Sequence, residues 1–483
     1  MQKVKQFLFQ NKTTKQTFAK NTFWLFFGDI MGRLLKLIVV VFATRVLGVE
    51  GWGVFAYALA FVSLFYALAD IGINTFITRE MSRGGIDKYH YLSASLVLKL
   101  FLLGFSFLIS LICIPYIGNI ALSIKIIIAL GLLNFSDSIR EFALSVNRAL
   151  EKMEREAFIK IIMNVITTSL GIMLLVFYTD PLSLAIAYAV GSIIATGITF
   201  WLVWPEFRKI TWKFTGKSLR TIFDFAWPFI AITLFSTAIA SIDSIMLGQM
   251  KSAADVGLYA AAQRLVQFLA IIPIFIAASV FPIMAKAYGD EESSTRIFEK
   301  IMTTTLALGI PIAIGGFIFS SPIITLIFGS DYSAGGMVLG ILMLSILAVF
   351  PNIILDNSIF TRNLQRKFIG ATAVGLLGNI IINLYLIPRY GALGAAVSTV
   401  VTQLLIMSFN WHYLKRFFHF SIINRLWIIM IANAIMLGVI VIGNILNIYF
   451  VVTILISMCI YIGALYLLKE PLIQEIQSII KIH

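Results

Sequence analysis

The chain has 483 residues, of which 60% are hydrophobic and only 12% are charged, and its mean hydropathy is +0.95. Soluble domains contain about a quarter charged residues, so this composition excludes a water-soluble globular protein. The net charge of +14 is compatible with a polyanionic partner such as nucleic acid, or with the excess of Lys and Arg that membrane proteins carry in their cytoplasmic loops.

Long apolar runs, separated by short polar breaks, follow one another through the whole chain. A helix that crosses a bilayer needs about 20 apolar residues. We therefore expect an all-α integral membrane protein with about 14 transmembrane helices. The predicted spans are about 22–46, 52–77, 89–115, 119–142, 157–178, 181–204, 221–249, 256–284, 297–320, 332–358, 367–388, 391–414, 424–446 and 448–469.

The connections between these spans alternate in charge. One set contains only Lys125, Lys251 and Arg389, whereas 29 of the 37 Lys and Arg residues lie in the other set and near the termini. Because cations accumulate on the cytoplasmic side, both termini are predicted to be cytoplasmic and the membrane to be the plasma membrane. This distribution explains most of the net charge, and we predict no nucleic-acid partner.

The N-terminal segment is basic and is not a cleavable signal peptide, because no small-residue cleavage site follows a short apolar region. It lies as a helix on the anionic inner leaflet or remains a disordered tail. Cys113 and Cys459 lie inside apolar segments, and the four histidines form no metal-binding pair. The sequence therefore predicts no metal site and no cofactor.

An internal repeat relates the two halves of the chain. Segment 47–58 resembles segment 247–262, and segment 148–152 resembles segment 362–366. Each repeat contains six spans, an even number, so both enter the membrane in the same direction and form two parallel six-helix lobes around a central cavity. The predicted domains are a cytoplasmic N-terminal segment, two lobes, and two additional C-terminal helices with a cytoplasmic tail, at 1–21, 22–215, 216–420 and 421–483.

Five motifs carry a family resemblance, and they lie at 47–55, 70–73, 243–248, 256–259 and 388–396. In this order they resemble the polysaccharide flippases of the multidrug/oligosaccharidyl-lipid/polysaccharide exporter superfamily. The resemblance implies a flippase that moves a polyprenyl-pyrophosphate-linked oligosaccharide from the cytoplasmic to the outer leaflet by alternating access. It leaves open an ion-coupled multidrug antiporter and a peptidoglycan lipid-precursor flippase. The implied partners are this substrate, membrane lipids, H⁺ or Na⁺, and other membrane proteins of polysaccharide assembly.

Ionisable residues inside the predicted spans are the candidate site residues, because a charge in the bilayer interior is costly and faces a cavity or a partner. Arg33, Lys36, Lys99 and Arg264 are predicted to line a cationic cavity that binds the pyrophosphate, since guanidinium and ammonium groups bind phosphate oxygens. Asp29 precedes Arg33 by one helical turn and is either an ion-pair partner or a coupling residue.

Acidic residues near the ends of the spans are candidates for other roles. Asp70 and Asp243 are candidate gates, and Asp137 and Asp356 are expected to take part in gating or helix-end interactions. The outward connections are too short to hold an active-site domain, the longest being 321–331, and no nucleotide-binding loop or nucleophile motif is present. We therefore predict that the protein is not an enzyme.

Overall fold

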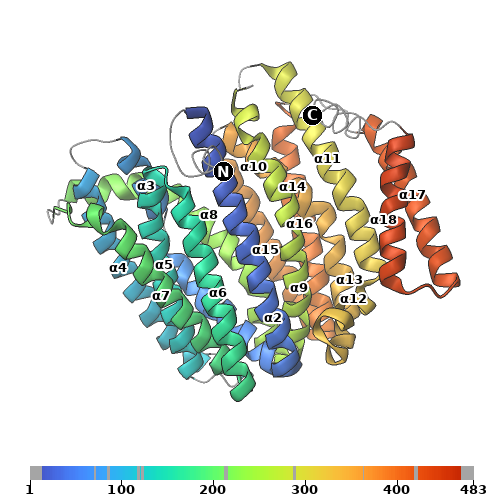
Figure 1. Cartoon of the computed structure of the whole chain (residues 1–483), viewed down its shortest axis with the longest axis horizontal. Coiled ribbons are helices and arrows are strands. Elements are labelled where there is room, and N and C mark those ends of the chain that lie inside the picture. The colour runs from blue at the N-terminus through green and yellow to red at the C-terminus, as the bar shows by residue number, and fades with distance from the viewer. Residues whose placement is uncertain are drawn as a thin grey trace, which may run out of the picture. The chain divides into compact units, whose positions relative to one another are not determined.

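The computed structural model describes residues 14–69, 72–83, 88–116, 120, 124–211, 216–286, 290–362, 364–417 and 423–468. In these ranges every regular element is a helix and no β-strand occurs (Figure 1). The predicted all-α architecture is confirmed. Of the candidate gates, Asp70 lies outside the described residues, as does most of the predicted N-terminal segment.

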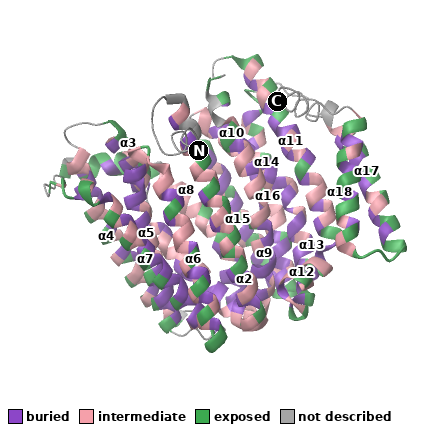
Figure 2. Cartoon of the chain, in the orientation of Figure 1, coloured by how far each residue is buried: buried purple, intermediate pink, exposed green. Residues whose placement is uncertain are grey.

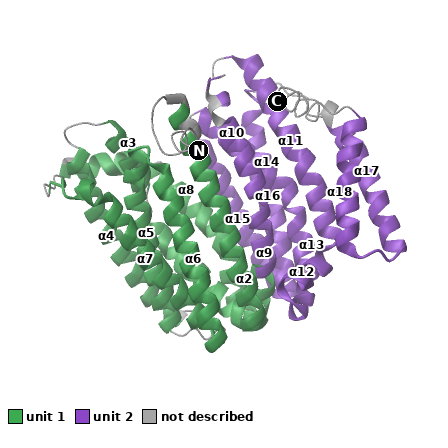
Figure 3. Ribbon diagram, viewed as in Figure 1, with its two compact units in different colours: residues 1–260 green, residues 261–483 purple. Residues whose placement is uncertain are grey.

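The chain divides into two compact units, residues 1–260 and 261–483 (Figure 3). Unit 1 contains α2 (Thr14–Tyr66), α3 (Ile73–Arg83), α4 (Lys88–Ile112), α5 (Ile124–Ala149), α6 (Met153–Phe177), α7 (Pro181–Phe207), α8 (Gly216–Met250) and the start of α9 (Ala253–Leu269). Unit 2 contains the rest of α9, α10 (Ile271–Lys286), α11 (Glu291–Ile318), α12 (Ser320–Phe328), α13 (Gly336–Leu344), α14 (Ile346–Thr361), α15 (Gln365–Tyr390), α16 (Ala392–Leu414), α17 (Ile423–Ile445) and α18 (Phe450–Leu467). The predicted lobes 22–215 and 216–420 are defined by spans rather than by contacts, and they stay a prediction.

In the described part of the chain, 11 helices are long and apolar enough to cross a membrane, or 12 if the bent pair of α2 and α3 is counted as one span. α5 is not among them, because Asp137, Arg140 and Glu141 all fall in its second half. α2 runs through the first predicted span and into the second, where it ends at Tyr66, and within it only Gly48 leaves the helical conformation. The exact number of 14 spans therefore stays a prediction.

The predicted connection 321–331 is wrong as a loop. It contains α12, followed by a short 3-10 helix at Ser330–Gly335. Pro322 lies in the first turn of α12, where a proline costs no helical hydrogen bond. Ile324 and Phe328 are buried, and Gly329 ends the helix with a φ of +104°. A nine-residue helix is too short to span a bilayer, so a search for long apolar runs does not detect it.

α17 and α18 pack against α11 in unit 2. The hydroxyl of Tyr461 in α18 donates a hydrogen bond to the carbonyl oxygen of Ala307 in α11 at 2.7 Å. Buried side chains including Ala432 and Met436 complete the contact. The other faces of these two helices carry exposed apolar side chains (Figure 2). Such faces suit contact with lipid chains, which are as apolar as the side chains themselves.

The turn after the first span is tightly packed. Gly48 has a φ of +66°, a conformation that glycine adopts without strain. A Cβ atom on Gly53 would overlap the backbone carbonyl of Ala253, and one on Gly257 would overlap the carbonyl oxygen of Val49. The backbones of α2 and α9 therefore approach so closely, within unit 1, that no side chain fits between them.

Replacing Gly53 with Ala should lower the thermal unfolding temperature of the purified protein, because the added methyl group must displace the backbone of α9. The matched control is Gly197→Ala in α7, where a Cβ meets nothing within 4 Å. That change should be neutral or stabilising by up to about 1 kcal/mol, since Ala favours the helix over Gly. Equal unfolding temperatures for the two variants would contradict the close approach.

Candidate functional site

Three ionisable residues, Asp29, Arg33 and Lys36, form the charged face of α2. The Arg33 Nε donates to Asp29 Oδ2 at 2.9 Å, and both side chains are about one-third exposed. Asp29 and Arg33 thus form an ion pair in the structure, and a role of Asp29 in coupling stays a prediction. Lys36 is exposed one turn further along the helix. It lies 12 residues before Gly48, about 18 Å along a helix, which places it near the middle of the first span.

The packing of α2 against α6 explains why this face stays accessible. A Cβ atom on Gly28 would overlap the backbone of Ala157 in α6. About two turns later along α2, the Thr168 hydroxyl of α6 donates to the carbonyl oxygen of Leu35 at 3.0 Å. Residues of a helix are offset by about 100° each, so the charged face lies roughly a quarter turn from the side that contacts α6. The close approach at Gly28 therefore holds α6 against one side of α2, and the charged side chains lie on another side of α2.

Lys99 is enclosed within unit 1, unlike Lys36. Its side chain has an exposed fraction of 0%, and its Nζ donates to Asn74 Oδ1 of α3 at 3.2 Å. α3 and α4 pack together around it. In this conformation, the Lys99 ammonium group therefore binds a neighbouring helix and has no surface available for a ligand.

Arg264 lies in α9 and belongs to unit 2. Its side chain is half-buried, and Nη1 donates to Gln267 Oε1 at 3.2 Å. The four predicted cations are thus divided between the two units, with three in unit 1. Their assembly into one cationic cavity stays a prediction.

The candidate gate Asp243 is buried at the end of α8. Its Oδ2 accepts a hydrogen bond of 2.6 Å from the hydroxyl of Tyr259 in α9. This bond connects the two helices that flank the turn at Lys251 and Ser252. A carboxylate held in this way fixes the turn between α8 and α9, and its role as a gate stays a prediction.

Arg140 is a buried cation that the sequence did not single out, because it was counted with the charged connection after the fourth span. The structure extends α5 to Ala149, so that Arg140 lies inside the helix. Its Nη1 donates to Asp137 Oδ1 at 2.6 Å and to the Ser192 hydroxyl of α7 at 3.3 Å. Ser192 also donates to Asp137. The spacing of three residues between Asp137 and Arg140 was the available signal.

A second charge cluster joins the end of α5 to the start of α6. Glu156 is almost fully buried and accepts from Arg148 Nε and Nη2, each at 2.8 Å, while Lys160 Nζ lies 3.2 Å away. In the first turn of α6, Glu154 Oε2 accepts a hydrogen bond of 2.9 Å from Lys20 of α2, whose side chain is buried. These ion pairs connect three helices of unit 1.

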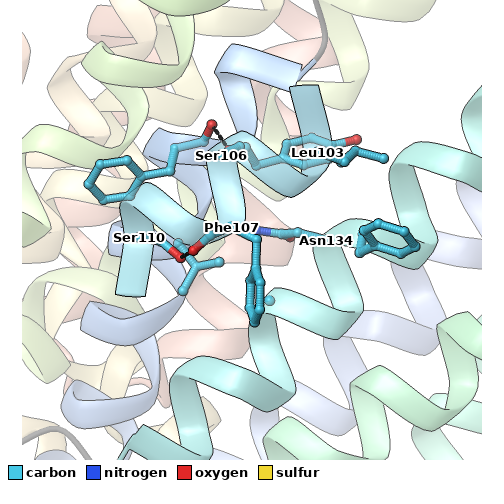
Figure 4. Close-up of a pocket in the computed structure, with 10 residues that line it drawn as sticks. Leu103, Ser106, Phe107, Ser110 and Asn134 are labelled. Carbon is cyan, nitrogen blue, oxygen red and sulfur yellow. Dashed lines mark hydrogen bonds between the residues drawn. The ribbon is translucent and has the colours of Figure 1, made fainter. Parts of the chain in front are cut away.

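A small pocket lies between α2, α4 and α5 (Figure 4). Its walls include Phe107 and Asn134, and the side-chain nitrogen of Asn134 is buried with no hydrogen-bond partner among the described residues. The Ser110 hydroxyl donates to the carbonyl oxygen of Phe107 at 2.7 Å. The free interior of about 20 Å³ is enough for one water molecule. In this conformation the pocket is therefore too small for a sugar ring.

Comparison with known families identifies the protein. The profile of the family described as "Polysaccharide biosynthesis protein" matches residues 18–288, which is more than half of the chain. The chain belongs to this family. The profile of the MatE family matches residues 228–385. The protein is a polysaccharide flippase of the multidrug/oligosaccharidyl-lipid/polysaccharide exporter superfamily, as the sequence predicted, and it is a multi-pass membrane protein.

Individual relatives agree with this assignment. The chain is 23% identical over 401 residues to a probable low-salt glycan biosynthesis flippase, Agl15, of Haloferax volcanii, covering 83% of this chain and 84% of that protein. It is 26% identical over 399 residues to a putative O-antigen transporter of Shigella dysenteriae, covering 81% and 98%. These two relatives are named as a flippase and a transporter, and the family matches agree with them, so the prediction that the protein is not an enzyme is confirmed.

Solved structures share the fold. The structure of the lipid II flippase MurJ in an inward closed conformation superposes with a TM-score of 0.74 at 19% identity, covering 93% of this chain and 99% of that chain. An inward-facing multidrug resistance transporter of the MATE family superposes with a TM-score of 0.68 at 14% identity, covering 80% and 94%. At these identities the likeness concerns the fold of the flippase.

Replacing Arg140 with Leu should destabilise the flippase by about 2–4 kcal/mol, because Asp137 loses its cation in a largely apolar setting. Asp137 is 32% exposed, so the effect should be smaller than for a fully buried pair. The double variant Asp137→Leu/Arg140→Leu should recover part of the loss. Denaturant or thermal unfolding of the purified variants measures both effects, and a double variant less stable than Arg140→Leu would contradict the pairing.

Proposed function

We propose that this flippase carries a polyprenyl-pyrophosphate-linked oligosaccharide from the cytoplasmic to the outer leaflet by alternating access through a cationic cavity. The supporting observation is the charged face of α2. It places two cations and one acid inside a membrane span, so its net charge is positive. A charge at that depth is costly unless it faces water or an opposite charge. A pyrophosphate group would supply that opposite charge.

The chemistry of the four cations supports this substrate class. Arg33 and Arg264 offer planar guanidinium groups that can bind two phosphate oxygens at once, whereas Lys36 and Lys99 act as compact point charges. Lys99, enclosed against Asn74, reaches a substrate only if α3 and α4 separate. We therefore assign Arg33 and Lys36 to binding in the described conformation and Lys99 to another stage of the cycle.

The names of the relatives support the same cargo. Two of them are named a glycan biosynthesis flippase and an O-antigen transporter. The alternatives are the peptidoglycan lipid precursor, which also carries a pyrophosphate, and the cationic compounds of a drug antiporter. A positively charged cavity disfavours the second alternative, because it would repel a cationic cargo. H⁺ or Na⁺ is the proposed coupling ion, with Asp29 as one residue that would bind it.

Reconstituted liposomes provide the test of this function. Wild-type protein should translocate a fluorescent polyprenyl-pyrophosphate oligosaccharide. Lys36→Gln and Arg264→Gln should each slow translocation about 10- to 150-fold, since a hydrogen bond to a charged group contributes about 1.5–3 kcal/mol. Arg389→Gln is the matched control. Arg389 lies at the end of α15, where its guanidinium stacks on Tyr385 at 3.8 Å, and its removal should leave the rate unchanged.

Each other outcome of this assay has a defined meaning. Undiminished translocation by both variants would overturn the cationic cavity while leaving the flippase assignment intact. If the protein translocates the peptidoglycan precursor and not the oligosaccharide, its function is that of a peptidoglycan-precursor flippase. Ion-driven uptake of a cationic dye, without movement of either lipid, would show the drug antiporter.

We also propose that both termini face the cytoplasm, on the basis of the charge difference between the two sets of connections. In a variant without Cys113 and Cys459, a cysteine at Asn447 should react with a membrane-impermeant maleimide added to intact cells. A cysteine at Lys209 should react only after the membrane is opened. Both positions are exposed, so the comparison reports sidedness. The reverse pattern would invert the proposed orientation.

A further inference from the structure

Unit 2 contains a carboxylate whose surroundings differ from those of the acidic residues in unit 1 that pair with a cation. Asp29 pairs with Arg33, Asp137 with Arg140, and Glu156 with Arg148. Asp356 lies in α14, five residues before the end of the helix at Thr361. In the described part of the chain it has one hydrogen-bond partner, Asn410 of α16, and it forms no ion pair.

The side chains around Asp356 form a polar seam between α14 and α16. Asn410 is fully buried and donates from Nδ2 to Asp356 Oδ1 at 2.9 Å. One turn earlier on α14, Asn352 donates from Nδ2 to Gln403 Oε1 at 3.2 Å and to the Gln403 carbonyl oxygen at 3.0 Å. The Oδ1 atoms of Asn352 and Asn410 are buried and have no hydrogen-bond partner among the described residues. The seam therefore contains one carboxylate and two uncommitted acceptors.

The helices packed against α14 supply no compensating charge. α10, α11, α15 and α16 carry charged or titratable groups toward the same end of the bundle as Asp356, and Arg362 directly follows the end of α14 at Thr361. These groups are Lys286, Glu299, Lys300, Arg366, Lys367, His412, Tyr413, Lys415 and Arg416. None of those that the structure describes pairs with Asp356, and they lie toward the ends of their helices.

Asp356 is half-buried, and its Oδ1 faces the fully buried Asn410, so an ionised carboxylate here is partly removed from water and has no cation paired with it among the described residues. This state is unfavourable, and a bound proton removes the charge. Asp356 has a partner in either state. The ionised form accepts from the Asn410 amide, and the protonated form gains an O–H donor beside a seam that holds free acceptors. A sodium ion is a poorer fit, because it needs several oxygen ligands and Asp356 Oδ1 faces an N–H donor.

We propose that Asp356 binds and releases a proton in the seam between α14 and α16, so that unit 2 carries a proton-exchange site. The site is separate from the charged face of α2, which lies in unit 1. It does not depend on the identity of the transported lipid, because the carboxylate and its amide partners all belong to α14 and α16. Proton exchange at this position would give the flippase a coupling ion.

The test uses dicyclohexylcarbodiimide, an apolar reagent that modifies protonated carboxylic acids inside membranes. The full-length protein in liposomes, without substrate, is treated across a range of pH and the adducts are located by peptide mass spectrometry. The expected result is an adduct on Asp356 that decreases about tenfold for each pH unit above its midpoint. Asp356→Asn should remove the adduct, and exchanging Na⁺ for choline should not change it.

Two variants serve as matched controls. Arg33→Leu frees Asp29 from its cation, so Asp29 should become labelled in that variant and remain unlabelled in the wild type. Asn410→Ala removes the donor that stabilises ionised Asp356, so labelling should extend to higher pH. The proposal is overturned if Asp29 is labelled in Arg33→Leu while wild-type Asp356 is unlabelled at every pH. Protection of Asp356 by Na⁺ would also overturn it, by showing a sodium site.

Discussion

The cost of holding a charge in apolar surroundings governs the arrangement of the ionisable side chains in this structure. Buried charges in unit 1 are compensated by close contacts, as in the pairs of Lys20 with Glu154 and of Arg148 with Glu156. Each pair also joins separate helices. The requirement to neutralise buried charge thus adds specific contacts between helices to the apolar packing.

This constraint also separates structural charges from functional ones. Arg140 donates hydrogen bonds to Asp137 and Ser192, and it thereby contributes to the packing of α5 against α7. The charged face of α2 carries two cations and one acid, so these three side chains together have a net positive charge. In unit 2, by contrast, Asp356 is an acid that pairs with no cation among the described residues. The roles proposed above therefore differ between the two units, with binding of an anionic cargo proposed at α2 in unit 1 and proton exchange proposed at α14 in unit 2.

Much of the fold could be predicted from the sequence, because apolar runs of spanning length and glycine-rich turns are local signals. The ion pair of Asp29 and Arg33 followed from their spacing for the same reason. Two features could not be found in this way. α12 is shorter than a span. Arg140 lies at the end of the predicted span 119–142 and was assigned to the charged connection that follows, although the helix continues to Ala149. The enclosure of Lys99 by Asn74 depends on contacts between helices, which no single-helix pattern reports.

The turn at Gly48 has a practical consequence for labelling and detecting this flippase. Gly48 is the one non-helical residue between the two halves of α2, and Val49 and Gly53, which follow it, contact the backbone of α9. An inserted epitope or fluorescent tag would have to break that contact, so insertion here should fail. The turn at Asn447 is different, since its flanking residues Leu446, Ile448 and Tyr449 are exposed. An antibody epitope placed there would remain accessible without disturbing either unit.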